Sequence, residues 1–185
     1  MNFNDHSNLK DLHAFLSPSK YHWVRYTDEK LLDKLKTHRA TEEGVIKHAY
    51  AEQAIRLGRK QGGPNDAIKL HINDAIGFRM TPEVVLSYSP WCFGTADAIG
   101  FNSRKSKLRI HDLKTGTTPA SMDQLMVYTA IFCLEYDVKP SEIETELRIY
   151  QGVEPIIYIP EVPEIVPIMD KIVWFDKLID STFER

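Results

Sequence analysis

Residues 94–116 read GTADAIGF, then NSRKSK, then LRIHDLKTG. Two strand-forming runs flank a short polar segment, a pattern that predicts a β-hairpin. Each arm carries one carboxylate, Asp97 on the first and Asp112 on the second. Because side chains alternate along a strand, Asp112 and Lys114 share a face, while Leu113 points into the core. Two carboxylates on neighbouring strands, with an ammonium group beside them, suit a divalent cation and the chemistry of a phosphodiester.

Hydrophobic periodicity and turn residues predict the elements around this hairpin. In chain order they are a helix that opens at Ser17, helices over 27–39, 41–57 and 68–76, a strand over 83–88, the hairpin arms over 94–101 and 107–113, a helix over 119–135, strands over 146–151 and 156–159, and a helix over 164–179. This order predicts a mixed α/β protein, in which helices flank a central mixed sheet and the N-terminal region is helical. A chain of 185 residues is long enough for one well-buried domain and short for two, so we expect a single domain over residues 1–185.

Composition excludes several classes of function. The net charge of −3 argues against a passive nucleic-acid binder, which would carry a basic excess. The only cysteines, Cys92 and Cys133, cannot form a cysteine-based zinc site or an iron–sulfur cluster. Two free thiols in a reducing compartment are favoured over one buried disulfide. The first ten residues lack the apolar run of a signal peptide, and no segment has the length of a membrane span, so a cytoplasmic protein is expected.

Two residue pairs on the predicted helices are further candidates. His48 and Glu52 lie four residues apart and therefore face the same side of their helix. A lone helical histidine is more often structural, although an imidazole can complete a divalent-metal shell. Gln124 and Tyr128 have the same spacing, and they form either an ordinary helix face or a pair of phosphate contacts. Spacing alone leaves both alternatives open.

Charged residues near the hairpin are candidates for supporting roles. Arg104 and Lys105 lie in the predicted turn, and Glu83 begins the preceding strand. The two cations are either a solvated face or contacts to a phosphate backbone.

The ordered motifs resemble a known family. The hairpin pattern G-T-A-D, followed after fourteen residues by D-L-K-T-G and then by Q-L-M-V-Y, is similar to the RecB-type branch of the PD-(D/E)XK nuclease superfamily. The resemblance covers roughly residues 17–151 and leaves 152–185 as a C-terminal extension. It departs from the superfamily pattern at Ala96, where many members have proline before the first acid. The chain also lacks the cysteines that hold an iron–sulfur cluster in some relatives, so it is closer to the compact phage-type exonucleases.

The resemblance implies a restriction-endonuclease-like core and a Mg²⁺- or Mn²⁺-dependent deoxyribonuclease. It implies that His48, Asp97, Asp112 and the Leu113 carbonyl bind the metal, and that Lys114 acts on the attacking water. The residues expected at the DNA are Gln124 and Tyr128, with support from Glu52, Glu83, Arg104 and Lys105.

An exonuclease of recombination, repair or phage DNA metabolism is favoured, without an iron–sulfur cluster, in a bacterial or phage-infected cell. Its expected partners are single- or double-stranded DNA ends, a recombinase, helicase or single-strand-binding protein, and further copies of itself. One alternative is a nuclease-fold subunit that binds DNA or assembles with other proteins without turnover. Another is an endonuclease, although little chain is left for a recognition module.

Overall fold

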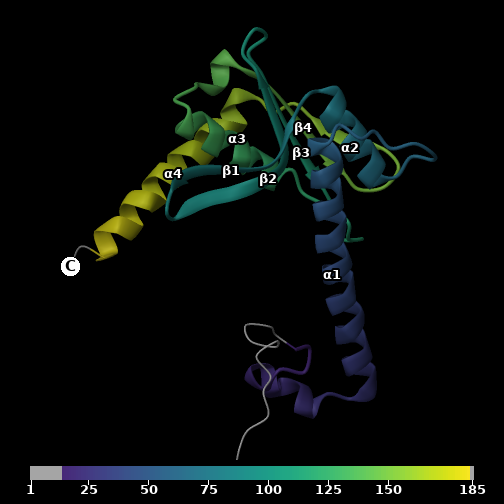
Figure 1. Ribbon diagram of the computed structural model, residues 1–185. Coiled ribbons are helices and arrows are strands. Elements are labelled where there is room, and N and C mark those ends of the chain that lie inside the picture. Colours follow the sequence, from purple (N-terminus) through teal and green to yellow (C-terminus); the bar gives the residue numbers. More distant parts are fainter. Residues whose placement is uncertain (1–13, 184–185) are drawn as a thin grey trace, which may run out of the picture. The chain divides into compact units, whose positions relative to one another are not determined.

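The computed structural model describes residues 14–183, and the polar segment 1–13 lies outside the described residues. The elements are the 3₁₀ helix η2 (Pro18–Arg25), α1 (Asp28–Arg56), α2 (Ala67–Gly77), β1 (Thr81–Ser89), β2 (Cys92–Asn102), β3 (Lys107–Leu113), α3 (Asp123–Glu135), the 3₁₀ helix η3 (Pro140–Glu142), β4 (Glu144–Tyr150), β5 (Pro155–Tyr158) and α4 (Val162–Phe183) (Figure 1). The expected α/β protein, with a five-strand mixed sheet packed against helices and an N-terminal helix, is confirmed.

The prediction of two helices over 27–39 and 41–57 is wrong, because α1 runs without a break from Asp28 to Arg56. Thr41 resembles a helix cap in the sequence, but its hydroxyl donates to the Thr37 carbonyl at 3.0 Å within the helix. The true start lies at Thr27, whose hydroxyl oxygen accepts the Lys30 amide at 3.3 Å.

The chain divides into two compact units, one ending at Val45 and the other beginning at Ile46. In the first unit, the helix predicted from Ser17 is the 3₁₀ helix η2, and the Trp23 indole donates to the Ser17 carbonyl at 3.0 Å. The second unit holds the whole sheet. The single nuclease domain expected over residues 1–185 stays a prediction.

The five strands lie in the order β1-β2-β3-β4-β5, and only β3 and β4 are parallel. Parallel neighbours require a crossover connection, which α3 provides between β3 and β4. The helix predicted over 119–135 begins four residues later than expected, at Asp123.

The sheet has a hydrophobic cluster on each face. The paired residues Ile99 and Ile110 belong to the cluster that contains the buried residues of α3. Ala98, one residue before Ile99, belongs to the cluster formed with α2 and the end of α1. Successive strand residues face opposite sides, so the helices cover both faces.

Cys92 and Cys133 are free thiols, as favoured from the sequence. None of the helices within residues 14–183 combines the length and the apolar character that a membrane span requires.

Candidate metal centre

Asp97 lies where the strands of the hairpin separate. The β2–β3 register ends at the pair Ala98–His111, so Asp97 has no partner residue in β3. Its carboxylate accepts the Leu113 amide at 2.7 Å in place of a backbone carbonyl. A side chain therefore closes the end of the ladder, which places a carboxylate between the two arms.

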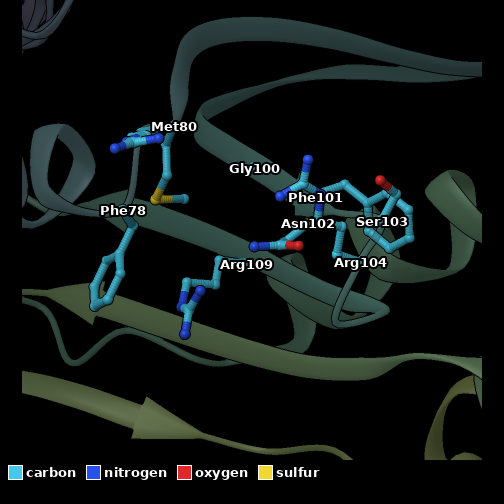
Figure 2. Close-up of a pocket in the computed structure, with 9 residues that line it drawn as sticks. Phe78, Met80, Gly100, Phe101, Asn102, Ser103, Arg104 and Arg109 are labelled. Carbon is cyan, nitrogen blue, oxygen red and sulfur yellow. The ribbon is translucent and has the colours of Figure 1, made fainter.

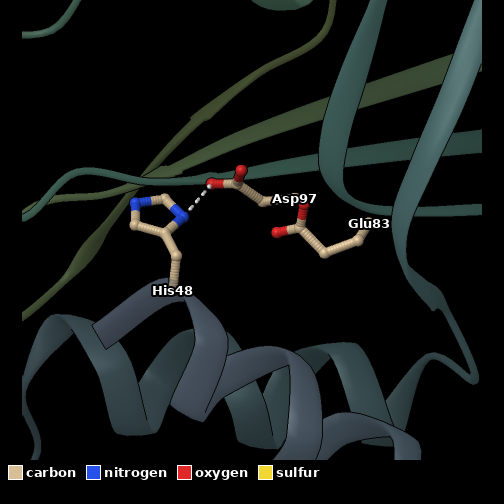
Figure 3. Close-up of side chains that lie close together, drawn as sticks. All are labelled: His48, Glu83 and Asp97. Atoms are coloured by element: carbon tan, nitrogen blue, oxygen red, sulfur yellow. Dashed lines mark ion pairs between the residues drawn. The ribbon is translucent and has the colours of Figure 1, made fainter. Parts of the chain in front are cut away.

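His48 reaches this carboxylate from α1. Its Nδ1 lies 3.4 Å from Asp97 Oδ2 (Figure 3). The hydrogen bond to Asp97 raises the pKa of His48 above its usual 6.5, although burial opposes this effect. Burial would raise the pKa of Asp97, but the hydrogen bonds from His48 and the Leu113 amide hold it below its usual value. The two side chains therefore stabilise each other's charged form.

Glu83 completes a group of three side chains that could hold a metal ion. One ligand atom from each of His48, Glu83 and Asp97 lies within 4.8 Å of the other two (Figure 3). Two ligands of one Mg²⁺ lie at most about 4.2 Å apart, because each bond is about 2.1 Å long. The group therefore needs little adjustment to hold an ion.

The backbone at Glu83 is strained. Its φ of +50° is unusual for a strand residue, and the β1–β2 register skips from Pro82–Ala98 to Val84–Ala96 at this point. Residues held in such a conformation cost about 1–3 kcal/mol and concentrate at functional sites. Burial and the charge of Asp97 raise the pKa of Glu83, so a cation between the two acids would relieve their repulsion.

Asp112, Lys114 and Gln124 form a second cluster. Lys114 Nζ lies 3.1 Å from Asp112 Oδ1 and 3.0 Å from Oδ2, and it donates to Gln124 Oε1 at 2.8 Å. Asp112 is only 4% exposed, and its Oδ2 has no well-directed hydrogen bond. Burial and the charge of Asp97 raise the pKa of Asp112. An incompletely bonded buried carboxylate next to a second acid is a donor that suits a cation.

The remaining predicted site residues lie outside the group formed by His48, Glu83 and Asp97. Tyr128 donates its hydroxyl to the Thr95 carbonyl at 2.6 Å and covers Gly94, where an added Cβ would lie 3.0 Å from the tyrosine ring. Glu52 accepts Arg56 Nε at 2.8 Å, and it is not a member of the ligand group. Arg104 and Lys105 lie in the β2–β3 turn, at the end of the hairpin opposite Asp97.

A cavity of about 320 Å³ adjoins the second cluster. Its lining includes Lys114 and the backbone of Gly116 and Gly152. The Gln151 amide donates to the Gly116 and Thr118 carbonyls, each at 2.7 Å, and so fixes the loop that follows β3. There is open space next to the lysine for a ligand larger than a metal ion.

Sequence reasoning missed a buried polar network next to the site. His71 and His111 are each at most 1% exposed, and Tyr150 donates to Asp74 at 2.8 Å beside them. Burial lowers the pKa of His71 to about 4 and that of His111 well below 6.5, so both rings are neutral at pH 7. A histidine adjacent to Asp112 is a weak signal in the sequence, and no motif singles out His71.

No protein-family model, curated protein or solved structure matches this chain. Two carboxylates and an imidazole are ligands for Mg²⁺, Mn²⁺ or Zn²⁺, and the adjacent Asp112–Lys114 pair can exchange a proton or bind an anion.

Proposed function

We propose that this protein is a metal-dependent nuclease of the PD-(D/E)XK type that hydrolyses phosphodiester bonds in DNA. One observation carries the proposal. Ligand atoms from α1, β1 and β2 converge within 4.8 Å at the end of an antiparallel hairpin whose second strand leads into the Asp112–Lys114 pair. The topology of a mixed sheet with a parallel β3–β4 pair crossed over by α3 supports a restriction-endonuclease-like core.

His48, Glu83 and Asp97 are the residues that would hold Mg²⁺ or Mn²⁺, and Asp112, outside this group, interacts with the charge of Asp97. The cation would lower the pKa of a water molecule and offset charge on the phosphate oxygens. Lys114 is oriented by Asp112 and Gln124. In the proposed enzyme its ammonium group would stabilise the negative charge that develops in the transition state. Tyr128 supports the Gly94–Thr95 backbone, and in the proposed enzyme this keeps Asp97 in position.

The test is incubation of the purified protein with end-labelled linear single- and double-stranded DNA and Mg²⁺ or Mn²⁺, with EDTA as the blank. Lys114→Ala should lower the rate by about 100-fold or more, because removing one positioned donor to the transition-state charge costs about 10²–10³. Lys139→Ala is the matched control, since Lys139 is an exposed lysine in a weak pair with Glu142. Full activity of Lys114→Ala would reject the mechanism.

Two further outcomes decide among related functions. Cleavage of a circular substrate would identify an endonuclease, because an exonuclease requires an end. DNA that stays intact with both metals, while the protein still binds it, would identify a non-catalytic DNA-binding subunit.

A further inference from the structure

A second cavity, of about 440 Å³, lies between the end of α2 and the β2–β3 turn (Figure 2). Its lining includes three arginines, Arg79, Arg104 and Arg109, and contains neither aspartate nor glutamate. Asn102 also lines it, and its Oδ1 accepts the Lys105 amide at 3.2 Å, which leaves its NH₂ group as a donor. The charged and amide groups that line the pocket are therefore hydrogen-bond donors.

Arg109 is held in place before any ligand binds. Its Nε donates to Glu146 at 3.1 Å, and its guanidinium lies 4.3 Å from the centre of the Phe78 ring (Figure 2). Glu146 also pairs with Arg148 at 2.9 Å and with Lys107 at 3.1 Å, and each of these two cations has a further acidic partner. The network therefore balances the Arg109 charge and fixes the orientation of its guanidinium.

Arg79 and Arg104 are not neutralised by this protein. Within residues 14–183 neither side chain has an ion pair or a hydrogen bond, and both are exposed. Guanidinium groups bind phosphate oxygens through paired N–H donors, and three of them around one cavity favour an anion with several oxygens.

The backbone at Arg79 is in a conformation that an arginine rarely adopts. At the end of α2 the Met80 amide bonds the Ala75 carbonyl at 2.8 Å and the Arg79 amide bonds the Ile76 carbonyl at 3.1 Å, with a φ of +57° at Arg79. This is a Schellman motif, and the residue at this position is usually glycine.

The end of α1 has the same motif with the usual residue. The Arg59 amide bonds the Ala54 carbonyl at 2.9 Å, and Gly58 has a φ of +62°. The sequence thus has glycine at the end of α1, and at the end of α2 it has an arginine that the conformation disfavours. Strain of this kind is common where a side chain is needed for binding.

We propose that this arginine pocket binds a phosphoryl anion. The source is either a backbone phosphate of a nucleic-acid strand or a free phosphorylated small molecule. Asn102 lies five residues along β2 from Asp97, a separation of about 17 Å in a strand. The phosphate bound here is thus not the one at the metal centre. Only the nucleic-acid source rests on the proposed function.

The experiment compares Arg79→Gly/Arg104→Gln with Lys139→Ala/Lys177→Ala. Both double variants remove two exposed positive charges, and the second removes them outside the pocket. Binding of a fluorescent single-stranded oligonucleotide is measured by anisotropy at several salt concentrations in EDTA, so that no hydrolysis occurs. Inorganic phosphate is titrated separately by calorimetry. Circular dichroism checks the fold, and Arg104→Gln alone, in an exposed turn, serves as the milder variant.

If the pocket binds a nucleic-acid strand, the slope of log affinity against log salt should fall in magnitude by about 0.7 in the arginine variant, because the loss of one phosphate contact on a single strand removes about 0.7. The lysine variant should keep the slope of the wild type. If the source is a small molecule, the slope is unchanged, and phosphate binds the wild type but not the arginine variant. Equal slopes together with no phosphate binding to the wild type would overturn the proposal.

These readouts do not require catalysis. A protein that shows the slope change but never cuts DNA would refute the nuclease and leave the pocket standing. A protein that cuts DNA but shows neither the slope change nor phosphate binding would refute the pocket and leave the nuclease standing.

Discussion

Replacement of Arg79 by glycine should stabilise this protein. An L-residue in the left-handed helical region costs about 1–2 kcal/mol, and Arg79 lies there with a φ of +57°. Glycine removes this cost, but it adds about 0.4–1 kcal/mol of chain entropy to the unfolded state. Within the described residues the Arg79 side chain has no hydrogen bond or ion pair to lose. The net gain should be about 0.5–1 kcal/mol, which raises Tm by about 1–4 °C in a chain of this size.

Gly58→Ala is the matched control for this prediction. Gly58 occupies the same position of the same motif at the end of α1, and a Cβ added there would meet no atom within 4 Å. Only the backbone effect remains, so this variant should lose about 0.5–1 kcal/mol.

Urea unfolding of both variants, with thermal melts as a second measurement, gives the two free energies. If Arg79→Gly lowers the free energy of unfolding while Gly58→Ala behaves as expected, the arginine side chain stabilises the fold. In that case the strain argument for a binding role is refuted.

Three further predictions concern the metal centre and the buried histidines. Glu83→Gln should weaken Mn²⁺ binding at least about tenfold, measured by calorimetry, without loss of stability, because it removes a ligand and its repulsion with Asp97. Metal affinity should rise with pH, because Asp97 raises the pKa of His48 above 6.5 and the ion must displace the proton on His48. The His48→Asn variant should bind the metal more weakly, and its affinity should lack the pH dependence that comes from His48. Between pH 7 and pH 5 the wild type should lose about 2 kcal/mol more stability than His71→Leu. The reason is that His71 takes up a proton near pH 6.5 in the unfolded state, whereas in the folded state, with a pKa of about 4, it does not. Equal pH dependence of the two proteins in urea melts would contradict this.

The sequence predicted the elements in which neighbouring residues decide the outcome. The hairpin arms expected over 94–101 and 107–113 are β2 and β3, because strand alternation and the polar turn are local features. The Asp112–Lys114 contact can also be predicted from the sequence, since residues two apart in a strand have their side chains on the same face. The break expected between the two N-terminal helices was wrong, because a threonine can cap a helix or lie inside one, and packing selects between these states.

The ligand group could not be assembled in the same way. His48 and Asp97 are far apart in the sequence, and helical spacing left the histidine undecided until the motif resemblance suggested a role. The sequence predicted only a supporting role for Glu83. Its approach to Asp97 depends on the pairing of β1 with β2 and on a positive φ, and no sequence pattern predicts either.

The hairpin, the two acids on its arms and the lysine beside the second acid can be predicted from local periodicity, because it fixes which side chains share a face. Local patterns do not show that the β2–β3 ladder ends at Ala98, so that Asp97 lies beside His48 and Glu83. Nor do they show that three arginines line one cavity. These contacts depend on how separate elements pack and pair, and the free energy of that packing is a property of the whole chain.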